Sequence, residues 1–333
     1  MIEDKIKIVE DILKNKKIAI AFSGGADSTL ISYIAKKVAS EVLLITVNNH
    51  LMPSDFLSGS KKIASTLKLP QEIIDMNFYK NDEFIENKPN RCYLCRDLMY
   101  SEIIKLANSR GFKTIIDGTN ISDLLDDRPG ILINYKNNIE SPFVKGGLES
   151  FEIHKYLDIN DIKYLKSSTC LATRINTNLT KEKIQRIQKS EDFIKNHTDC
   201  EIVKVREKEN ISICEVDKIS PLLDENKLNL IDNQLKSYGF KKVCLNLSPI
   251  EEKGKFFLDY DEENNCFKYQ LPYNINLSKT QKIFENSKLN NNYIKTGNIH
   301  IFDDGKIIGN GFKNKKEAKK EFLKILPNLR REI

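Results

Sequence analysis

A glycine-rich turn between a buried strand and a helix is the feature that most constrains how this chain can fold. The apolar run at residues 18–22 shows no alternation of polar and apolar side chains, which is typical of a strand buried in a parallel sheet. The hexapeptide SGGADS, residues 23–28, follows at once, and apolar residues then recur at helical spacing. A strand, a tight turn and a helix in this order predict a unit of an α/β fold.

The rest of the N-terminal half repeats this alternation of strand and helix. Strand-like runs occupy residues 42–47, 73–75 and 114–117, and helical patterns occupy residues 2–13, 54–67 and 93–107. We therefore expect an α/β fold with a doubly wound parallel sheet and right-handed crossovers. Ligands of such sheets bind at the carboxyl ends of the strands.

The pattern changes near residue 181, where an amphipathic helix precedes shorter strand-like runs. These runs lie at residues 201–205, 211–216 and 242–247, and further candidate strands lie at 299–302 and 306–308, before a basic terminal helix. A charged stretch at 251–255 separates the two groups. We therefore predict three parts: an α/β domain at 1–180, a smaller α+β domain at 181–252 and a C-terminal extension at 253–333.

Composition excludes several classes of protein. The chain has 333 residues, of which 40% are hydrophobic and 30% charged, as expected for a folded protein rather than a disordered one. No apolar run approaches a membrane-spanning length, and the polar N-terminus does not resemble a signal peptide, so we expect a cytoplasmic protein without membrane contact. A net charge of +6, from 53 basic and 47 acidic residues, disfavours a nucleic-acid partner. A homo-oligomer is compatible with these features.

The SGGADS turn has the composition of a phosphate-binding loop. Gly24 and Gly25 allow the backbone to approach a ligand closely, and the start of the following helix offers unpaired N–H groups to an anion. Ser23 and Ser28 add hydroxyl donors. Asp27 would repel phosphate unless a metal ion lay between them, so we expect Mg²⁺ there. The alternative is an ordinary turn in which Asp and Ser cap a helix.

Three of the seven cysteines are placed for chemistry. Cys92 and Cys95 form a C-x-x-C at the start of a helix, and Cys170 lies in the segment STCLATR. Three thiolates suit a [4Fe–4S] cluster that has one open iron. The alternatives are a redox pair of Cys92 and Cys95 with Cys170 separate, and a zinc site completed by a histidine such as His154. The other cysteines, which we expect to be buried and inert, are Cys200, Cys214, Cys244 and Cys266.

Two further groups of polar residues are candidates for ligand contact. The sequence DGTN places Gly118, Thr119 and Asn120 directly after a predicted strand, where α/β sheets bind ligands, and the charged turn DDRPG follows at residues 126–130. The alternative is a turn followed by an exposed loop. Arg174 could bind a phosphate or carboxylate through its guanidinium fork.

These motifs together resemble a known family. SGGADS resembles the pyrophosphate-binding loop of the PP-loop ATP pyrophosphatases, which implies the adenine-nucleotide α-hydrolase fold, with adenine near Val47 and Asn48. RCYLCR, DGTN with DDRPG, and SSTCLATR extend the resemblance to the LarE-type ATP-dependent sulfur transferases over about residues 1–250. Residues 256–333 fall outside it.

The resemblance implies a reaction and a substrate. LarE-type enzymes use ATP and Mg²⁺ to adenylate a carboxylate of pyridinium-3,5-biscarboxylic acid mononucleotide and convert it to thiocarboxylate, in the biosynthesis of the nickel-pincer nucleotide cofactor. Members with one cysteine sacrifice its sulfur, whereas members with three carry a [4Fe–4S] cluster and need a sulfide donor. This sequence has all three cysteines and so resembles the cluster-bearing branch.

The resemblance also assigns roles to residues. Asp27 and Cys170 would be catalytic, and the loop, Val47, Asn48 and the DGTN residues would bind ATP. Lys204 and Arg206, which share one face of a predicted strand, would hold the substrate phosphate, although a solvated basic face is the alternative. Arg174 and Arg96, the latter at a position where the family often has lysine, complete the expected substrate site, and Glu191 and Glu215 correspond loosely to acidic residues near it. A tRNA thiolase that uses the same loop and cluster is the alternative function.

Overall fold

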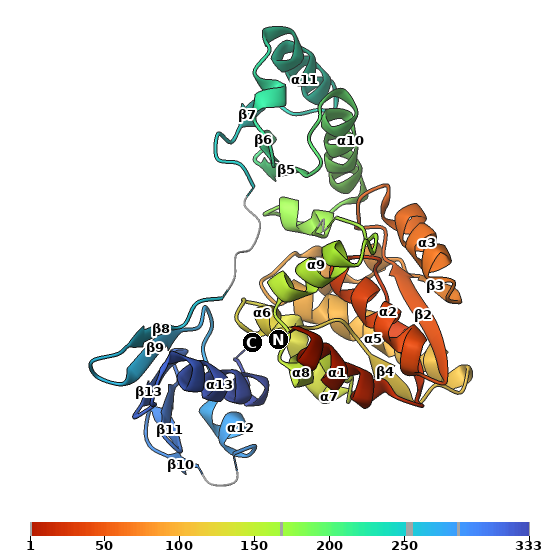
Figure 1. Ribbon diagram of the computed structural model, residues 1–333. Helices are drawn as coiled ribbons and strands as arrows, with labels where there is room; N and C mark the ends of the chain where they lie inside the picture. The colour runs from red at the N-terminus through yellow and green to blue at the C-terminus, as the bar shows by residue number, and fades with distance from the viewer. Residues whose placement is uncertain (1, 167–168, 251–255, 285–286, 333) are drawn as a thin grey trace.

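The computed structural model describes residues 2–166, 169–250, 256–284 and 287–332. The charged stretch predicted as a boundary, 251–255, lies outside these ranges. The described strands form three sheets, and Figure 1 shows them as three successive parts of the chain. No helix within these ranges is both long and apolar enough to cross a membrane.

The first sheet is parallel and carries the predicted order of elements. Its strands are β1 (Lys17–Ala21), β2 (Glu41–Asn48), β3 (Gln71–Asp75) and β4 (Thr114–Ile116). They lie in the order β3-β2-β1-β4, with Ile18 of β1 between Val42 of β2 and Thr114 of β4. The predicted doubly wound α/β fold is thus confirmed, and the strand ends bring residues 22–28, 49–51 and 117–120 to one edge of the sheet.

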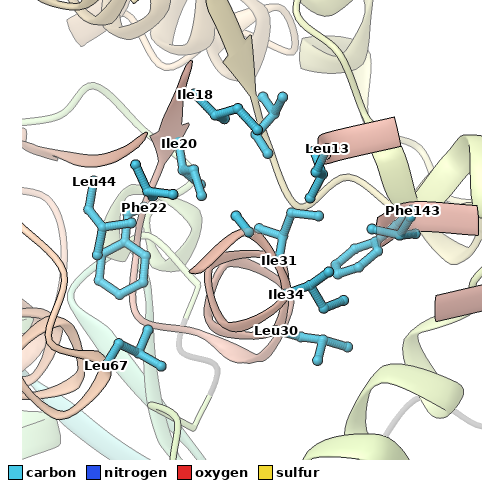
Figure 2. Close-up of a cluster of buried hydrophobic side chains, with 14 of the residues drawn as sticks. Leu13, Ile18, Ile20, Phe22, Leu30, Ile31, Ile34, Leu44, Leu67 and Phe143 are labelled. Carbon is cyan, nitrogen blue, oxygen red and sulfur yellow. The ribbon is translucent and has the colours of Figure 1, made fainter. Parts of the chain in front are cut away.

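Alternate residues of the central strands enter two separate cores. Ile18 and Ile20 face the helices α1 (Ile2–Leu13) and α2 (Ala26–Val38), as Figure 2 shows. Ala19 faces the opposite core, with α5 (Arg91–Ser109). Each fully buried aliphatic side chain of this kind stabilises the fold by roughly 1.5–3 kcal/mol. Helices on both faces therefore fix the sheet, and the strand ends are the positions left for binding.

Short helices connect the larger elements, and the sequence patterns did not predict them. They are α4 (Asp82–Ile85), α6 (Ile121–Leu124), α7 (Leu132–Lys136), α8 (Pro142–Gly146) and α9 (Ser150–Ile159), besides the predicted α3 (Phe56–Leu67). All of the unpredicted helices except the ten-residue α9 have four or five residues and are too short to show a period. Helix α6 depends instead on a reciprocal cap, in which Asn120 accepts from Ser122 N and Asp123 accepts from Asn120 N.

The second sheet is small and packs on two helices. Its strands are β5 (Val203–Lys208), β6 (Ile211–Val216) and β7 (Lys242–Leu245), and its helices are α10 (Lys181–His197) and α11 (Glu225–Ser237). Strand β5 begins two residues later than expected because Asp217 accepts from the backbone N–H groups of Glu201 and Ile202. Its core also includes Leu51 and Leu171 of the preceding part.

The third sheet is antiparallel, with the order β10-β11-β12-β13-β9-β8. Its strands are β8 (Asp259–Asp261), β9 (Cys266–Gln270), β10 (Lys288–Leu289), β11 (Tyr293–Thr296), β12 (Ile299–Phe302) and β13 (Lys306–Asn310). Helices α12 (Leu277–Gln281) and α13 (Lys315–Ile325) accompany it. Its core contains Ile121, Leu124 and Ile131 of the first part, so the extension is docked on the segment that follows DGTN. The domain limits at 180 and 252 stay predictions.

Candidate functional site

The SGGADS loop has the geometry of an anion cradle. Gly24 has φ +79°, in the left-handed region that favours glycine, and Gly25 is the N-cap of α2. The hydroxyls of Ser23 and Ser28 lie 3.1 Å apart, and Ser28 Oγ donates to Gly25 O at 3.1 Å. Both hydroxyls, together with the first N–H groups of a helix of 13 residues, lie where phosphate oxygens would be bound.

Asp27 is fixed by the DGTN segment, as two neighbouring strand ends predict. Asn120 Nδ2 donates to Asp27 Oδ1 at 3.0 Å. A Cβ on Gly118 would lie 2.8 Å from the Asp27 backbone, so only glycine allows this approach. Burial raises the pKa of Asp27 to about 7, and the nearby carboxylate of Asp123 adds to the rise, while Arg128 and Asn120 oppose it. Such a buried carboxylate next to a second one is suited to hold a divalent cation.

Leu165 closes one side of the loop. Its backbone N–H donates to Gly24 O at 2.7 Å, and the two segments form a parallel bridge. A Cβ on Gly59 of α3 would lie 2.5 Å from a Leu165 methyl, and one on Gly24 would lie 3.1 Å from it. Two glycines far apart in sequence therefore make room for one leucine. The same segment reaches Cys170 five residues later.

Arg96 interacts with other residues of the protein rather than being left open for a ligand. Its guanidinium pairs with Asp117 and donates to Thr119 Oγ1 at 3.1 Å. Burial alone would raise the pKa of Asp117, yet Arg96 and donors from Asn134 and other neighbours hold it below its usual value. This network supports the DGTN turn from beneath, so the observed contacts favour a positioning role for Arg96. Its predicted contact with substrate stays a prediction.

The predicted adenine contacts lie at the end of β2. Val47 is buried, and Asn48 donates from Nδ2 to Asp75 Oδ1 at 2.8 Å. His50 also approaches Asp75, with Nε2 and Oδ2 3.1 Å apart. Both predicted residues are thus at the correct edge of the sheet, and the roles assigned to them stay predictions.

The three cysteines come from two segments that Arg91 joins. Cys92 and Cys95 lie on the first turns of α5, and Cys170 immediately precedes the short 3-10 helix Leu171–Arg174. Arg91 Nη2 lies 3.6 Å from Cys92 Sγ, and Arg91 Nη1 donates to Ala172 O at 3.1 Å. Leu171 N donates to Leu51 O at 2.7 Å, which holds the Cys170 segment against the end of β2.

The thiols are neighbours, but they do not form a ready-made site for a single ion. Burial raises the pKa of the Cys95 thiol well above its usual range, and the nearby Cys170 and Cys92 add to the rise. Burial also raises the pKa of Cys170. Within the described ranges, no group of three or more His, Cys, Asp or Glu side chains is close enough to hold a metal ion. His154 instead stacks on Tyr164 at 5.6 Å.

The donor set nevertheless fits an iron–sulfur cluster in its chemistry. Cluster ligands are thiolates attached to different irons, so their sulfurs stand further apart than the ligands of one zinc ion. Cys92, Cys95 and Cys170 supply three thiols from two segments that Arg91 joins, which is the type of donor that such clusters use. The cluster stays a prediction.

The remaining cysteines belong to other elements of the fold. Cys200 and Cys214 are buried, and Cys200 Sγ donates to Lys218 O at 3.3 Å. Cys244 and Cys266 are half-buried in strands β7 and β9. The structural role that we expect for all four stays a prediction.

Arg174, Lys204 and Arg206 converge as three cations. Arg174 is 2% exposed and pairs with Glu191, with Nε and Oε1 2.8 Å apart. Arg206 Nη1 donates to Thr173 O at 3.1 Å, and its Nε pairs with Glu215 at 2.8 Å. Burial lowers the pKa of Lys204, and the charges of Arg174 and Arg206 lower it further.

Two polar groups in this cation cluster are left for a ligand. Arg174 Nη2 is buried and has no hydrogen-bond partner among the residues that the structure describes. Leaving a buried donor without a partner costs about 1–3 kcal/mol. Half-buried Lys204 has two cations, Arg174 and Arg206, as charged neighbours, and each of them is already paired with a carboxylate. The arrangement can therefore bind phosphate or carboxylate.

Sequence reasoning missed several residues of the site. Leu165, Gly59, Asn134 and Ser141 carry no local signal, since each acts through a partner at least 20 residues away or in another element. Arg91 was visible only as a cationic neighbour of Cys92. Its contact with Ala172 depends on the tertiary fold.

One family model and several known proteins are similar to this chain. Residues 17–87 match the family model of queuosine biosynthesis protein QueC. An uncharacterized protein of Methanocaldococcus jannaschii is 34% identical over 245 residues, which are 72% of this chain and 92% of that protein. An uncharacterized protein of Synechocystis is 26% identical over 74% of this chain and 95% of its own length.

Two relatives have assigned activities. Pyridinium-3,5-bisthiocarboxylic acid mononucleotide synthase of Lactiplantibacillus plantarum is 23% identical over 73% of this chain and 90% of its own length. The tRNA-specific 2-thiouridylase MnmA of Campylobacter jejuni is 31% identical, over 31% of this chain and 34% of its own length. The first match covers most of the chain, and the second covers a shared portion only.

Proposed function

The chain belongs to the LarE-type family of PP-loop sulfur transferases, and on this premise we propose that it converts a carboxylate of pyridinium-3,5-biscarboxylic acid mononucleotide to thiocarboxylate, with cleavage of ATP. The observation that carries the proposal is the segment from Leu165 to Cys170. Leu165 closes the phosphate loop, and Cys170 follows five residues later, so at most roughly 18 Å of chain separates the two. The activating loop and the thiols therefore belong to one site.

The first step joins the substrate to AMP. The loop and Asp27 with Mg²⁺ hold the phosphates of ATP, and a substrate carboxylate oxygen attacks the α-phosphorus. The bond from the α-phosphorus to its bridging oxygen breaks, and pyrophosphate leaves. Arg174, Lys204 and Arg206 bind the phosphate of the substrate and so orient its carboxylate. The protein contributes positioning and charge neutralisation, and no protein base is required because the carboxylate is already anionic.

The second step introduces sulfur. A sulfide ion attacks the acyl carbon, the bond to AMP breaks, and thiocarboxylate and AMP result. Cys92, Cys95 and Cys170 would hold a [4Fe–4S] cluster, which supplies an iron without a protein ligand where exogenous sulfide can bind. Arg91 keeps the two cysteine segments together and offsets thiolate charge.

The test measures turnover and the fate of Cys170 in the same sample. The anaerobically reconstituted protein, given ATP, Mg²⁺, sulfide and the mononucleotide substrate, should form more than one thiocarboxylate per chain. Intact-protein mass spectrometry should find Cys170 unchanged. A mass loss of one H₂S per product, mapped to Cys170, would instead show that this cysteine is the consumed donor. Absence of AMP would contradict the adenylating step.

A tRNA thiolase is the second candidate. The observation that favours it is the similarity to tRNA-specific 2-thiouridylase over 115 residues. Pyrophosphate release that depends on unmodified tRNA, and not on the mononucleotide, would replace the first proposal with this one.

A further inference from the structure

The antiparallel sheet of the C-terminal part has one face packed and one face open. Phe267 and Tyr269 of β9 contact Phe322 of α13, with ring centroids 5.6 Å and 5.0 Å apart. Figure 1 shows α13 against one side of this sheet. Since side chains alternate along a strand, the residues between these belong to the other face. Lys268, between the two aromatic residues, is exposed.

The pairing of the strands shows which residues of the neighbouring strands belong to this open face. Lys268 is opposite Ile308 of β13, Ile308 is opposite His300 of β12, and His300 is opposite Lys295 of β11. Lys295 is in turn opposite Lys288 of β10. The lysines are exposed and the other two residues half-buried, in contrast to the buried residues beside them. Lys268 and Lys295 are three strand spacings apart, roughly 14 Å.

Aromatic rings lie between these lysines. Tyr293 of β11 is opposite Phe302 of β12, with ring centroids 5.4 Å apart, and Tyr293 also contacts the ring of His300 at 5.3 Å. Lys306 Nζ lies 5.8 Å from the centroid of the Phe302 ring. Both aromatic side chains are half-buried, so part of each ring is accessible.

The charge of this open face is strongly one-sided. Its four lysines, at 268, 288, 295 and 306, stand against two carboxylates, Asp259 and Asp261, both at the far edge on β8. The whole chain, by comparison, has nearly balanced charges, 53 basic against 47 acidic. Accessible rings spaced among lysines on an open sheet are the arrangement on which bases of a single strand stack while cations bind its phosphates.

We propose that the open face of this sheet, formed by Tyr293, His300, Phe302 and the surrounding lysines, binds single-stranded RNA. The rings provide stacking surfaces that do not depend on base identity, and the lysines provide phosphate contacts. A folded protein partner fits less well, because such interfaces are depleted of lysine at their centre. The proposal does not depend on the sulfur-transfer reaction.

The test uses the full chain and a short fluorescein-labelled oligouridylate in a fluorescence polarisation titration. Binding should weaken as salt rises, with a slope of about −0.7 in log K against log salt for each phosphate contacted. Phe302→Ala and Tyr293→Ala should each weaken binding about tenfold. Lys268→Glu and Lys295→Glu, which change only exposed side chains, should weaken it and reduce the salt slope.

The matched control is Lys316→Glu on α13, which makes the same charge change away from the open face. It should leave the affinity within about twofold, since surface charges at a distance are screened. Loss of binding in the control with retention in Lys268→Glu would place RNA on the helix and overturn the proposal. Equal affinity for duplex RNA, or binding to anionic lipid vesicles without binding to the oligonucleotide, would overturn it as well. Pyrophosphate release with the mononucleotide should be unchanged in Lys268→Glu, which separates this result from the fate of the proposed reaction.

Discussion

The phosphate loop and the cysteine segments differ in how complete they are without a ligand. The loop has its hydroxyls, its glycine turn and Asp27 held by Asn120, all connected to a network in which Asp117 accepts from several donors. Arg91 and a backbone contact join the cysteine segments, and the described residues contain no group of three His, Cys, Asp or Glu side chains that could hold a single ion. The difference favours a nucleotide site that the fold alone organises, and the proposed function predicts a cysteine site that is completed by what it binds.

The largest effect that we expect is on catalysis, from a substitution in the phosphate loop. Under the proposed function, Asp27→Ala should reduce pyrophosphate release by roughly a thousandfold, because a metal held between the carboxylate and the phosphates would neutralise charge in the transition state. The measurement is release of labelled pyrophosphate in the presence of substrate. Thermal unfolding should show an intact fold, and Asp11→Ala, an exposed change on α1, should have no effect on the rate. Unchanged release in Asp27→Ala would remove the loop from the reaction.

The cysteine segments are tested by the amount of iron that the protein binds. Cys92→Ala, Cys95→Ala and Cys170→Ala should each lose most of the iron after anaerobic reconstitution, because a cluster held by two thiolates is poorly retained. The measurement is iron and sulfide analysis together with the absorption spectrum. Cys266→Ala, a half-buried cysteine on β9, is the matched control and should retain full occupancy. Full iron in Cys170→Ala would exclude it from the ligands and leave it a separate role.

The buried ion pair between Arg174 and Glu191 links the segment after Cys170 to α10. Its contribution to stability shows how firmly this segment is held. Glu191→Gln should destabilise the protein by about 3–5 kcal/mol, because it leaves the Arg174 charge uncompensated where it is buried. Urea unfolding measures this. Glu215→Gln, which breaks the partly exposed pair with Arg206, should cost no more than about 1 kcal/mol. Equal losses in the two variants would mean that the Arg174 pair is no more constrained than a surface pair.

The smallest effect concerns acid stability of the nucleotide region. The pKa of Asp117 in the folded protein lies below the ordinary value of 3.8 for an aspartate, so an unfolded chain binds the proton more readily. This contribution is therefore present above pH 3.8 and is lost as the pH falls through the lower folded-state pKa. Asp117→Asn should reduce the dependence of unfolding free energy on pH by up to about 1.4 kcal/mol per pH unit in this window.

Urea unfolding at a series of acidic pH values measures the Asp117 effect, with Asp11→Asn as the control. A slope unchanged by Asp117→Asn would show that the carboxylate gains nothing from its neighbours. The phosphate loop would then lack the support on which the comparison rests.

The features that the sequence predicted are formed by residues that follow one another in the chain. The strand at 17–21, the turn and the helix at 26–38 are consecutive, so their residues alone determine how Ser23, Asp27 and Ser28 are presented. Because β1 and β4 are parallel neighbours, the DGTN segment after β4 lies next to the SGGADS loop after β1. The antiparallel C-terminal sheet was mostly missed, because strands such as Cys266–Gln270 bury alternate aromatic residues within five positions and show no longer pattern.

The contacts that join segments could not be predicted in this way. The donation from Arg91 to Ala172 O spans 81 positions, and the one from Asn120 to Asp27 spans 93. Neither residue type specifies its partner. The cation cluster was predicted from alternation for Lys204 and Arg206, whereas the burial of Arg174 against Glu191 depends on how α10 packs on β5.

Gly59 on α3 shows how natural selection can act on a position that takes no part in the reaction. An added methyl group there would meet Leu165 at 2.5 Å, and Leu165 is bonded to Gly24 in the phosphate loop. A larger residue at position 59 would require the Leu165 side chain to move beside the phosphate loop. We therefore expect purifying selection to favour glycine at residue 59, while neighbouring exposed positions of the same helix are free to drift.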